Sequence, residues 1–368
     1  MSDDAVLAPD QIAGAPHPRE TATLYGQQGA EQAFLDAFSA GRMHSGWLIT
    51  GPRGVGKATL AWKIATFLLA DEPLDMLGDP TLAVSPDHPD AKLVQSGAHP
   101  RLALIRRPWD DKTGKFRAEI TVDAVRSLKH FFQMSATDGG RRVVIVDAAD
   151  EMNRNAANAI LKELEEPPAG AVILLVAHQP SRLLPTIRSR CRELRCHALG
   201  PDDLSRALAQ SGHSTDNAAG LAALAGGSVG DAIRLLGSGG LTLYADLVQL
   251  FDGLPQINRQ AGLHLADACA GRGAEARFGL TLDLIDLFLA RAARAGLLGE
   301  PTTQGAAGEA RLLARIAPNP RAAQAWARLQ QDLSERSRHG RAVNLDPAAL
   351  ILDMIFKIEE TAQGVAAA

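Results

Sequence analysis

Short apolar runs alternate with helical patterns between residues 21 and about 197. The runs fall at residues 46–50, 102–105, 143–146 and 172–176. They are apolar almost throughout, which is typical of strands buried on both faces of a parallel sheet. Between the last two runs, residues 153–166 place apolar side chains at helical spacing and end before two prolines. This order of strand, helix and strand predicts an α/β core in which helices cover a parallel sheet.

The pattern changes after Leu199, and the rest of the chain is predicted to be all-α. Short helices begin at Pro201, and the last helix begins with Asp346 as its N-cap and Pro347 in its first turn. Residues 71–100 show little periodicity and are predicted to be an irregular insertion. We therefore predict a mobile tail (1–20), an α/β core (21–198), a small helical lid (199–240) and a C-terminal helical domain (241–368).

Composition and charge narrow the class of protein. Over 368 residues, 46% hydrophobic and 22% charged residues are typical of a soluble globular protein with two or three domains. The net charge of −4 argues against a chain that wraps nucleic acid by itself, so contact with DNA is expected to be local or shared with partners. The N-terminus lacks a signal-sequence pattern, and the longest apolar run, residues 171–177, is too short to cross a membrane. These features predict a cytoplasmic protein without a membrane partner.

The cysteines, Cys191, Cys196 and Cys269, are too few for a four-thiolate zinc site, and their odd number argues against a disulfide framework. Two histidines in the predicted insertion, His88 and His99, have no thiolates near them in sequence and are interpreted as surface residues. We therefore expect free thiols and no zinc.

A glycine-rich loop follows the first predicted strand and opens a helix. It reads Gly51-Pro52-Arg53-Gly54-Val55-Gly56-Lys57. Glycines let backbone N–H groups approach phosphate oxygens at a helix N-terminus, and the lysine adds a positive charge. The alternative is a glycine-rich turn with a solvated lysine, but the placement between strand and helix favours a nucleotide-binding loop. The candidate nucleotide-binding residues are Gly51, Gly54, Val55, Gly56, Lys57, Ala58, Thr59 and Asp147.

Groups that ATP hydrolysis needs are missing around this loop. The position after the lysine normally carries a hydroxyl that holds magnesium, and here it is Ala58, with Thr59 about 100° further around the helix. Asp147 ends the third apolar run and can supply a carboxylate on the metal side. The next position would carry the glutamate that polarises the attacking water, and it is Ala148. We therefore predict that this site can hold ATP or ADP but cannot hydrolyse ATP. The protein is expected to need neither nucleotide as a cofactor.

Three segments of the chain resemble the AAA+ clamp-loader proteins. The first is the phosphate loop with the strand before it, and the second runs from Asp147 to the sequence Leu-Glu-Glu-Pro-Pro that ends at Pro168. The third contains the triplet Ser189-Arg190-Cys191. Together they span most of residues 21–197, while the helical remainder agrees with this family only in length and class.

The resemblance implies an AAA+ core, a helical lid and a helical collar domain, and it implies a role for Arg190. In this family the arginine of the triplet projects into the ATP site of a neighbouring motor subunit. Motor subunits also carry an arginine in a Gly-Ser-x-Arg motif of the lid, and here that position is Gly230. Together with Ala58 and Ala148, this loss implies a non-motor subunit that acts in DNA replication, with no polymerase or ATPase activity of its own.

The implied partners are the motor subunits and the delta subunit of the loader, and, through the complex, the sliding clamp and primer-template DNA. Several alternatives remain open. Arg190 and the neighbouring arginines could instead form a solvated surface. The chain could be an active motor ATPase of the same family, a small-molecule kinase with a phosphate loop, or a branch-migration helicase. A motor or a helicase would need the acidic pair that Ala148 interrupts.

Overall fold

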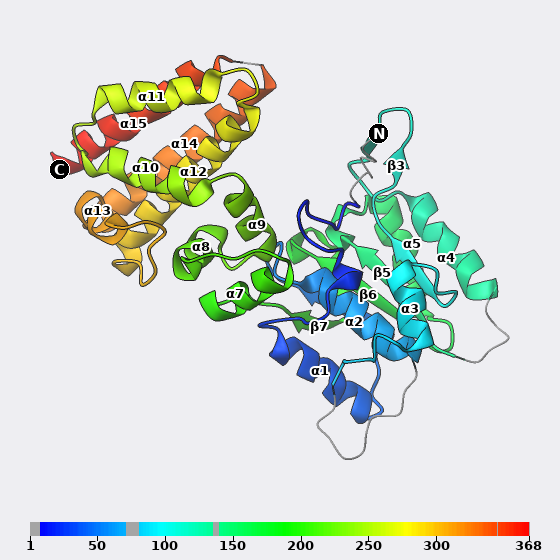
Figure 1. Ribbon diagram of the computed structural model, residues 1–368. Helices are drawn as coiled ribbons and strands as arrows, with labels where there is room; N and C mark the ends of the chain where they lie inside the picture. The colour runs from blue at the N-terminus through cyan, green and yellow to red at the C-terminus, as the bar shows by residue number, and fades with distance from the viewer. Residues whose placement is uncertain (1–7, 71–80, 135–139, 344, 368) are drawn as a thin grey trace. The chain divides into compact units, whose positions relative to one another are not determined.

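The computed structural model describes residues 8–70, 81–134, 140–343 and 345–367. Their contacts divide the chain into two compact units (Figure 1). Unit 1 comprises Met1–Ser214 and Ser228–Gly230, and unit 2 comprises Thr215–Gly227 and Asp231–Ala368. The lid predicted at residues 199–240 is thus shared between the units, and its boundaries stay a prediction.

A five-stranded parallel sheet forms the centre of unit 1. In spatial order, its strands are β2 (Leu102–Ile105), β5 (Arg142–Asp147), β6 (Ala171–Ala177), β1 (Gly46–Thr50) and β7 (Arg192–Arg195). The four apolar runs of the sequence are four of these strands, which confirms the predicted α/β core. The pattern missed β7, because this edge strand reads Arg-Glu-Leu-Arg and buries only Leu194.

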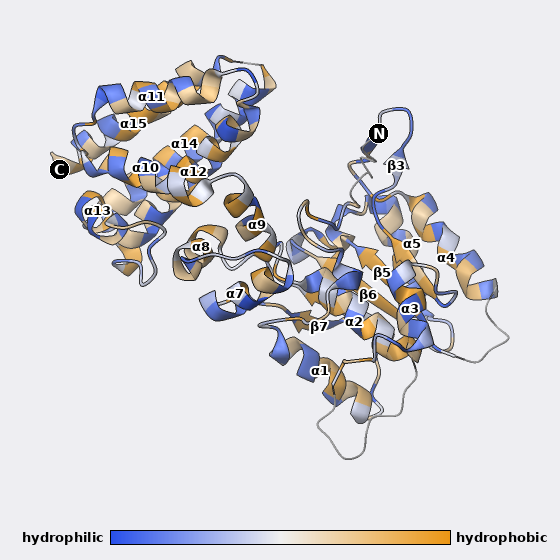
Figure 2. Cartoon of the chain, in the orientation of Figure 1, coloured by the Kyte–Doolittle hydropathy of each residue, from blue (hydrophilic) through white to orange (hydrophobic). Residues whose placement is uncertain are grey.

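Helices cover both faces of the sheet, and the sheet itself is the most hydrophobic part of unit 1 (Figure 2). One face packs against α4 (Val122–Met134), α5 (Arg154–Glu165) and α6 (Pro185–Arg188). The other face is covered by α1 (Gln28–Ser39) and α2 (Lys57–Ala70). On that face the Phe34 ring lies 5.0 Å from the Trp47 ring. Because successive strand residues point to opposite faces, strands covered twice must be apolar throughout, as observed.

The helix predicted at residues 153–166 is α5. The Asn153 side chain accepts a 2.9 Å hydrogen bond from the Ala156 backbone N–H, which satisfies one of the free donors of the first turn. Ile160 and Leu164 are buried against the sheet, and Pro167 follows the end of the helix. Local sequence signals therefore placed both ends of this element correctly.

The predicted irregular insertion was partly wrong, and so was the interpretation of His99 as a surface residue, because its side chain is buried beside Asp90. Residues 71–80 lie outside the described residues, but α3 (Pro89–Ser96) forms within the rest. His88 is its N-cap and accepts from the Asp90 N–H at 3.2 Å, and Gly97 ends it in the left-handed conformation. The helix is short and only Val94 is buried, so it carries little hydrophobic periodicity. Further on, β3 (Trp109–Asp110) and β4 (Lys115–Phe116) form an antiparallel hairpin.

The described part of the predicted mobile tail, residues 8–20, packs on unit 1. It includes the 3-10 helix η1 (Pro18–Glu20), and the side chains of Asp10 and His17 are 2% and 6% exposed. Proline, glycine and charged residues are typical of tails, but here the Asp10 carboxylate pairs with Arg106, which is 96 residues away in sequence. Local composition could not show those partners, so the prediction of a mobile tail was wrong for these residues.

The described part of unit 2 is helical, as predicted. Its helices are α8 (Ala218–Ala225), α9 (Val229–Gly237, whose first two residues belong to unit 1), α10 (Gly240–Asp252), α11 (Arg259–Ala270), α12 (Glu275–Leu298), α13 (Glu309–Ile316), α14 (Pro320–Ala342) and α15 (Pro347–Ala366). The first helix after the core, α7 (Pro201–Gln210), belongs to unit 1. Asp346 caps α15 by accepting from the Ala349 N–H at 3.0 Å, which confirms the predicted N-cap.

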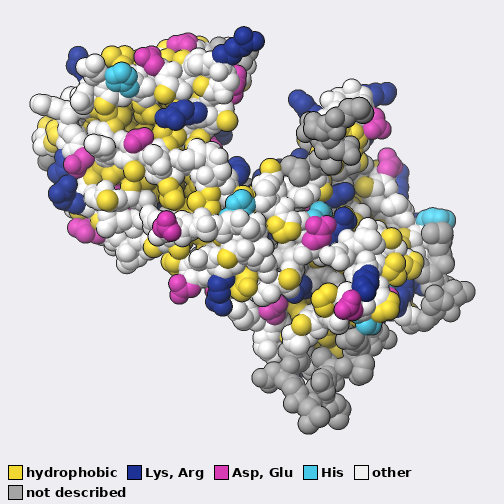
Figure 3. All heavy atoms as spheres, in the orientation of Figure 1, with side chains coloured by type: hydrophobic (Ala, Val, Ile, Leu, Met, Phe, Trp, Pro, Cys, Tyr) yellow, Lys and Arg dark blue, Asp and Glu magenta, His cyan; other side chains and the backbone are white. Residues whose placement is uncertain are grey.

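Large buried side chains hold unit 2 together. Phe251 of α10 and Phe288 of α12 have ring centroids 4.8 Å apart. Trp326 of α14 is fully buried, and its indole N–H donates to the Ile316 carbonyl at 2.8 Å. The face in Figure 3 shows acidic and basic side chains interspersed over both units, in keeping with the small net charge.

Within the described ranges, none of the helices taken singly has the length and hydropathy to cross a membrane. Only α8 and α9 taken together pass on length and composition, and these two helices are bent by 112° at their junction.

Candidate nucleotide site

The phosphate loop joins β1 to α2 at the carboxyl end of the sheet. Gly51, Gly54 and Gly56 have φ values of 140°, 75° and 99°, which side chains other than glycine adopt only with strain. A Cβ atom at Gly51 would lie 2.4 Å from the Cys196 carbonyl oxygen, so the loop packs directly on the chain after β7. The glycines are therefore required by backbone conformation and by close packing together.

Gln27, just before α1, fastens this loop to the segment after β7. Its amide donates to the Val55 carbonyl at 3.0 Å and to the His197 carbonyl at 2.8 Å, and its oxygen accepts from the His197 N–H at 2.9 Å. The side chain is buried, so these bonds satisfy groups that water does not reach. Sequence reasoning missed this role, because its partners lie 28 and 170 residues away.

Lys57 is buried at the first turn of α2, and its ammonium group donates to the Pro52 carbonyl of the loop. Burial lowers the pKa of Lys57 to about 8, although the negative charges of Asp147 and Asp150 oppose this shift. The ammonium group is thus mostly protonated at pH 7 and can pair with a phosphate.

Asp147 ends β5 as predicted and is buried. Burial and the negative charge of Asp10 raise the pKa of Asp147 to about 7, with Lys57 opposing the shift. A carboxylate must be ionised to bind a cation well. Its neighbour Ala148 and the loop residue Ala58 offer no oxygen from their side chains. These residues fit a phosphate group but do not fit the magnesium site of a hydrolysing enzyme.

The next two acidic residues are engaged in contacts within the protein. Asp150 accepts from the backbone N–H groups of His178 and Gln179 at 3.0 and 2.9 Å, which ties the 3-10 helix η2 (Ala149–Glu151) to the end of β6. Glu151 pairs with Arg107 at 2.8 Å and with Arg53 at 3.4 Å. Neither carboxylate therefore replaces the missing glutamate at position 148. Over the described part of the chain, no cluster of three or more His, Cys, Asp or Glu side chains could hold a metal ion.

The start of α9 lies against the phosphate loop. The Val229 N–H donates to the Gly54 carbonyl at 2.9 Å, and a Cβ atom at Gly54 would lie 2.1 Å from the Ser228 hydroxyl oxygen. The glycine–serine pair that marks the predicted lid therefore contacts the loop, and Gly230, where a motor subunit would carry arginine, is part of this junction. Thr59 is buried one residue beyond Ala58 in α2.

Arg190 lies at the opposite end of β1 from the phosphate loop. A Cβ atom at Gly46, the first residue of β1, would lie 3.3 Å from the Arg190 carbonyl oxygen, whereas the loop follows Thr50 at the other end. Five strand residues span about 16 Å. The guanidinium pairs with Glu165 at 2.7 Å and donates to the Thr186 carbonyl at 3.1 Å, and the side chain is 37% exposed. The structure therefore separates this arginine from the other candidate residues.

The chain has a parallel α/β core with a phosphate loop after β1 and an acidic residue at the end of β5, and a helical region follows the core in sequence. These features define a P-loop protein of the AAA+ class. A family profile described as "DNA polymerase III, delta subunit" matches residues 26–199. The chain is 35% identical to DNA polymerase III subunit delta′ of Pseudomonas aeruginosa over 62% of its length, and 34% identical to that of Escherichia coli over 46%. Over these matched residues the chain resembles the DNA polymerase III delta′ subunits, which are clamp-loader AAA+ proteins.

The matched regions span 66% and 46% of those two relatives, which is less than two thirds of either. DNA polymerase III subunit tau of Salmonella typhimurium is 28% identical over 52% of this chain. Among solved structures, a gamma subunit-related protein of Thermotoga maritima covers 89% of the chain and 99% of its own length, with 18% identity and a TM-score of 0.33.

The pKa of Asp147 predicts how stability depends on pH. The folded protein retains a proton up to about pH 7 that the unfolded chain releases near pH 4, so this stabilising contribution is complete below pH 4 and is lost as pH rises through 7. Asp147→Asn cannot ionise. When the pH is raised from 5 to 8, the parent protein should therefore lose roughly 1–3 kcal/mol in free energy of unfolding relative to this variant.

Urea denaturation at both pH values measures this difference. Asp123→Asn is the matched control, because that carboxylate is 85% exposed and the substitution should behave alike at the two pH values. A pH-independent difference between Asp147→Asn and the parent protein would contradict the raised pKa.

Proposed function

We propose that this chain is a non-motor subunit of a DNA polymerase III clamp loader and that Arg190 completes the ATP site of a neighbouring motor subunit. The observation that carries the proposal is the position of Arg190, which is partly exposed at the far end of β1 from the phosphate loop of its own chain. An arginine so placed cannot reach its own nucleotide site. It is available to an adjoining subunit, where a guanidinium group can donate paired hydrogen bonds to a γ-phosphate.

The chain's own site supports the non-motor assignment. Ala58 and Ala148 replace the groups that hold magnesium and orient water, and Gly230 replaces the lid arginine. Asp147, with its pKa raised to about 7, is only partly ionised at neutral pH. When a nucleotide reaches the loop, its phosphates would be held by backbone N–H groups around Gly54 and by Lys57, in a structural role without turnover.

The partners follow from the same proposal. Relatives of this chain are delta′, gamma and tau subunits of DNA polymerase III. We expect the chain to bind the motor subunits and the delta subunit, and to act on the sliding clamp and on primer-template DNA through the complex. The net charge of −4 agrees with DNA contact that is shared among subunits.

Reconstitution of the loader tests this function. Clamp loading onto primed DNA should require this chain together with the motor and delta subunits, and omitting it should abolish loading. Co-purification from source cells should recover the same subunits. Full loading without this chain would contradict the proposal.

ATP turnover by the isolated chain separates the non-motor subunit from a motor ATPase. We expect turnover at the background rate, because the magnesium and water-orienting groups are missing, and Lys57→Ala should leave that background unchanged. Steady-state phosphate release measures the rate. Clear turnover that Lys57→Ala removes would instead show an active motor.

A further inference from the structure

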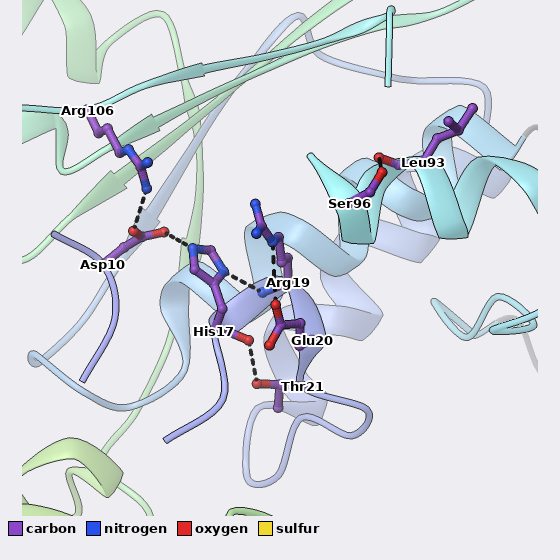
Figure 4. Close-up of polar contacts among 8 residues, drawn as sticks. All are labelled: Asp10, His17, Arg19, Glu20, Thr21, Leu93, Ser96 and Arg106. Carbon is purple, nitrogen blue, oxygen red and sulfur yellow. Dashed lines mark hydrogen bonds and ion pairs between the residues drawn. The ribbon is translucent and has the colours of Figure 1, made fainter. Parts of the chain in front are cut away.

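Residues 8–17, which we call the N-terminal strap, contact other parts of unit 1 near both of their ends, through Asp10 and through His17. At one end, the buried Asp10 carboxylate pairs with Arg106 after β2 at 3.1 Å and lies 3.3 Å from the His17 ring nitrogen Nε2 (Figure 4). His17 Nδ1 accepts from the Arg19 N–H at 3.2 Å, so the proton of a neutral ring is on Nε2 and faces Asp10. The carboxylate is thus held from two sides.

Two further contacts tie the N-terminal strap to helices. The His17 ring stands edge-on to the Trp62 ring of α2, with centroids 5.8 Å apart. The Gly14 carbonyl lies 2.7 Å from Nε2 of His213, just after α7. The attachment points lie after β2, on α2 and after α7, and the phosphate loop joins β1 to that same α2.

Between these attachments, Ile12 reaches the junction of the phosphate loop and α9. A Cβ atom built on Gly230 would lie 2.1 Å from the Ile12 Cδ1 atom and 3.9 Å from the Gly54 Cα atom. Ile12 therefore occupies the space that a side chain at position 230 would enter. An arginine at this position, as in the motor subunits, could not occupy the same place as Ile12.

We propose that the N-terminal strap closes the mouth of the phosphate loop and competes with nucleotide for this site. Ile12 fills the space at Gly230 beside Gly54 of the phosphate loop, and Asp10 places a carboxylate near Asp147. The loss of the side chain at Gly230 thus makes room for the protein's own segment. The inference rests on the geometry of unit 1 and does not depend on assembly of a clamp loader.

Charge supports the same conclusion. Burial raises the pKa of Asp10, but the contacts with His17 and Arg106 outweigh it and leave the pKa below its ordinary value. Asp10 is therefore ionised at neutral pH, and its charge acts on Asp147. A triphosphate at the loop would meet this negative charge beside the buried side chains of Lys57 and Asp147, and like charges repel more strongly away from water.

Titration of a fluorescent, non-hydrolysable ATP analogue into the full chain tests the proposal. The double variant Asp10→Ala/Ile12→Ala should bind at least about tenfold more tightly than the parent protein, since both obstructing groups are gone. Ala13→Ser is the matched control, because Ala13 lies in the strap but is exposed, and its affinity should equal that of the parent. Adding Lys57→Ala to the double variant should remove the gain.

Hydrogen exchange gives a second measurement that does not need activity. Backbone amides of residues 8–17 should be protected in the parent protein and should exchange faster in the double variant. An affinity that the double variant leaves unchanged would overturn the proposal, and so would a gain that persists with Lys57→Ala. Rapid exchange of the N-terminal strap in the parent protein would overturn it as well.

Discussion

Replacing Arg190 with alanine should lower DNA- and clamp-stimulated ATP hydrolysis by the neighbouring subunit about 10³-fold, while the reconstituted complex still assembles. An arginine supplied in trans stabilises charge that develops on the transferring phosphoryl group, and fingers of this kind contribute about 10³ to 10⁵ in rate. The contacts that Arg190 makes in its own chain, with Glu165 and the Thr186 carbonyl, lie near the surface. Their loss should cost at most about 1 kcal/mol of stability, so assembly and folding should survive.

Two further variants separate the finger from a general effect of charge. Arg190→Lys keeps the positive charge but loses the planar fork, so it should restore only a small part of the rate. Arg195→Ala removes an exposed arginine from the edge strand β7 and should leave hydrolysis unchanged. Phosphate release by the assembled complex, with assembly checked by gel filtration, measures all three. Normal hydrolysis by the Arg190→Ala complex would remove this residue from the neighbour's site.

Glu309→Ala should destabilise unit 2 by about 3–5 kcal/mol. Glu309 is fully buried at the start of α13. One of its oxygens accepts from the Tyr244 hydroxyl at 2.6 Å and from the Arg291 Nε at 2.5 Å, and the other accepts from the Arg291 Nη2 at 3.0 Å and the Gly305 N–H at 2.5 Å. Alanine leaves these donors buried without their acceptor, and the guanidinium loses its counter-charge.

The pKa of Tyr244 agrees with a tightly bound cluster around Glu309. Burial and the nearby Glu309 charge raise the pKa of Tyr244, so this hydroxyl stays protonated and keeps donating. Denaturation by urea, followed by circular dichroism, measures the loss. Arg311→Ala is the control, because that side chain is 79% exposed and its partner Asp252 lies 3.6 Å away, so less than about 1 kcal/mol should be lost. A loss below 1 kcal/mol for Glu309→Ala would contradict the importance of the buried cluster.

Local signals predicted the elements that depend on local physics. The strands β1, β5 and β6 had to be apolar on both faces, and α5 carried its cap at Asn153 and its stop at Pro167. The phosphate loop was visible because glycines, a lysine and the strand-to-helix context lie together in sequence. These features follow from backbone geometry within a few residues.

Features that depend on contacts between residues distant in sequence were not predicted by the sequence patterns. β7 forms because β1 offers it an edge, although its own residues are mostly charged. Gln27 joins the phosphate loop to residue 197, and the Glu309 cluster draws donors from α10 and α12. A buried polar group is stable only where folding brings its partners, and those partners leave no local signal.

The sequence by itself determined the α/β core, the phosphate loop and its missing groups, since each depends on residue types at short fixed spacings. It also singled out Arg190 through its triplet. Only the tertiary structure decided that Arg190 lies at the other end of β1 from the loop, that Ile12 lies against Gly230, and that Asp10 pairs with Arg106. Such placements depend on how distant segments meet, which the packing of the whole core determines.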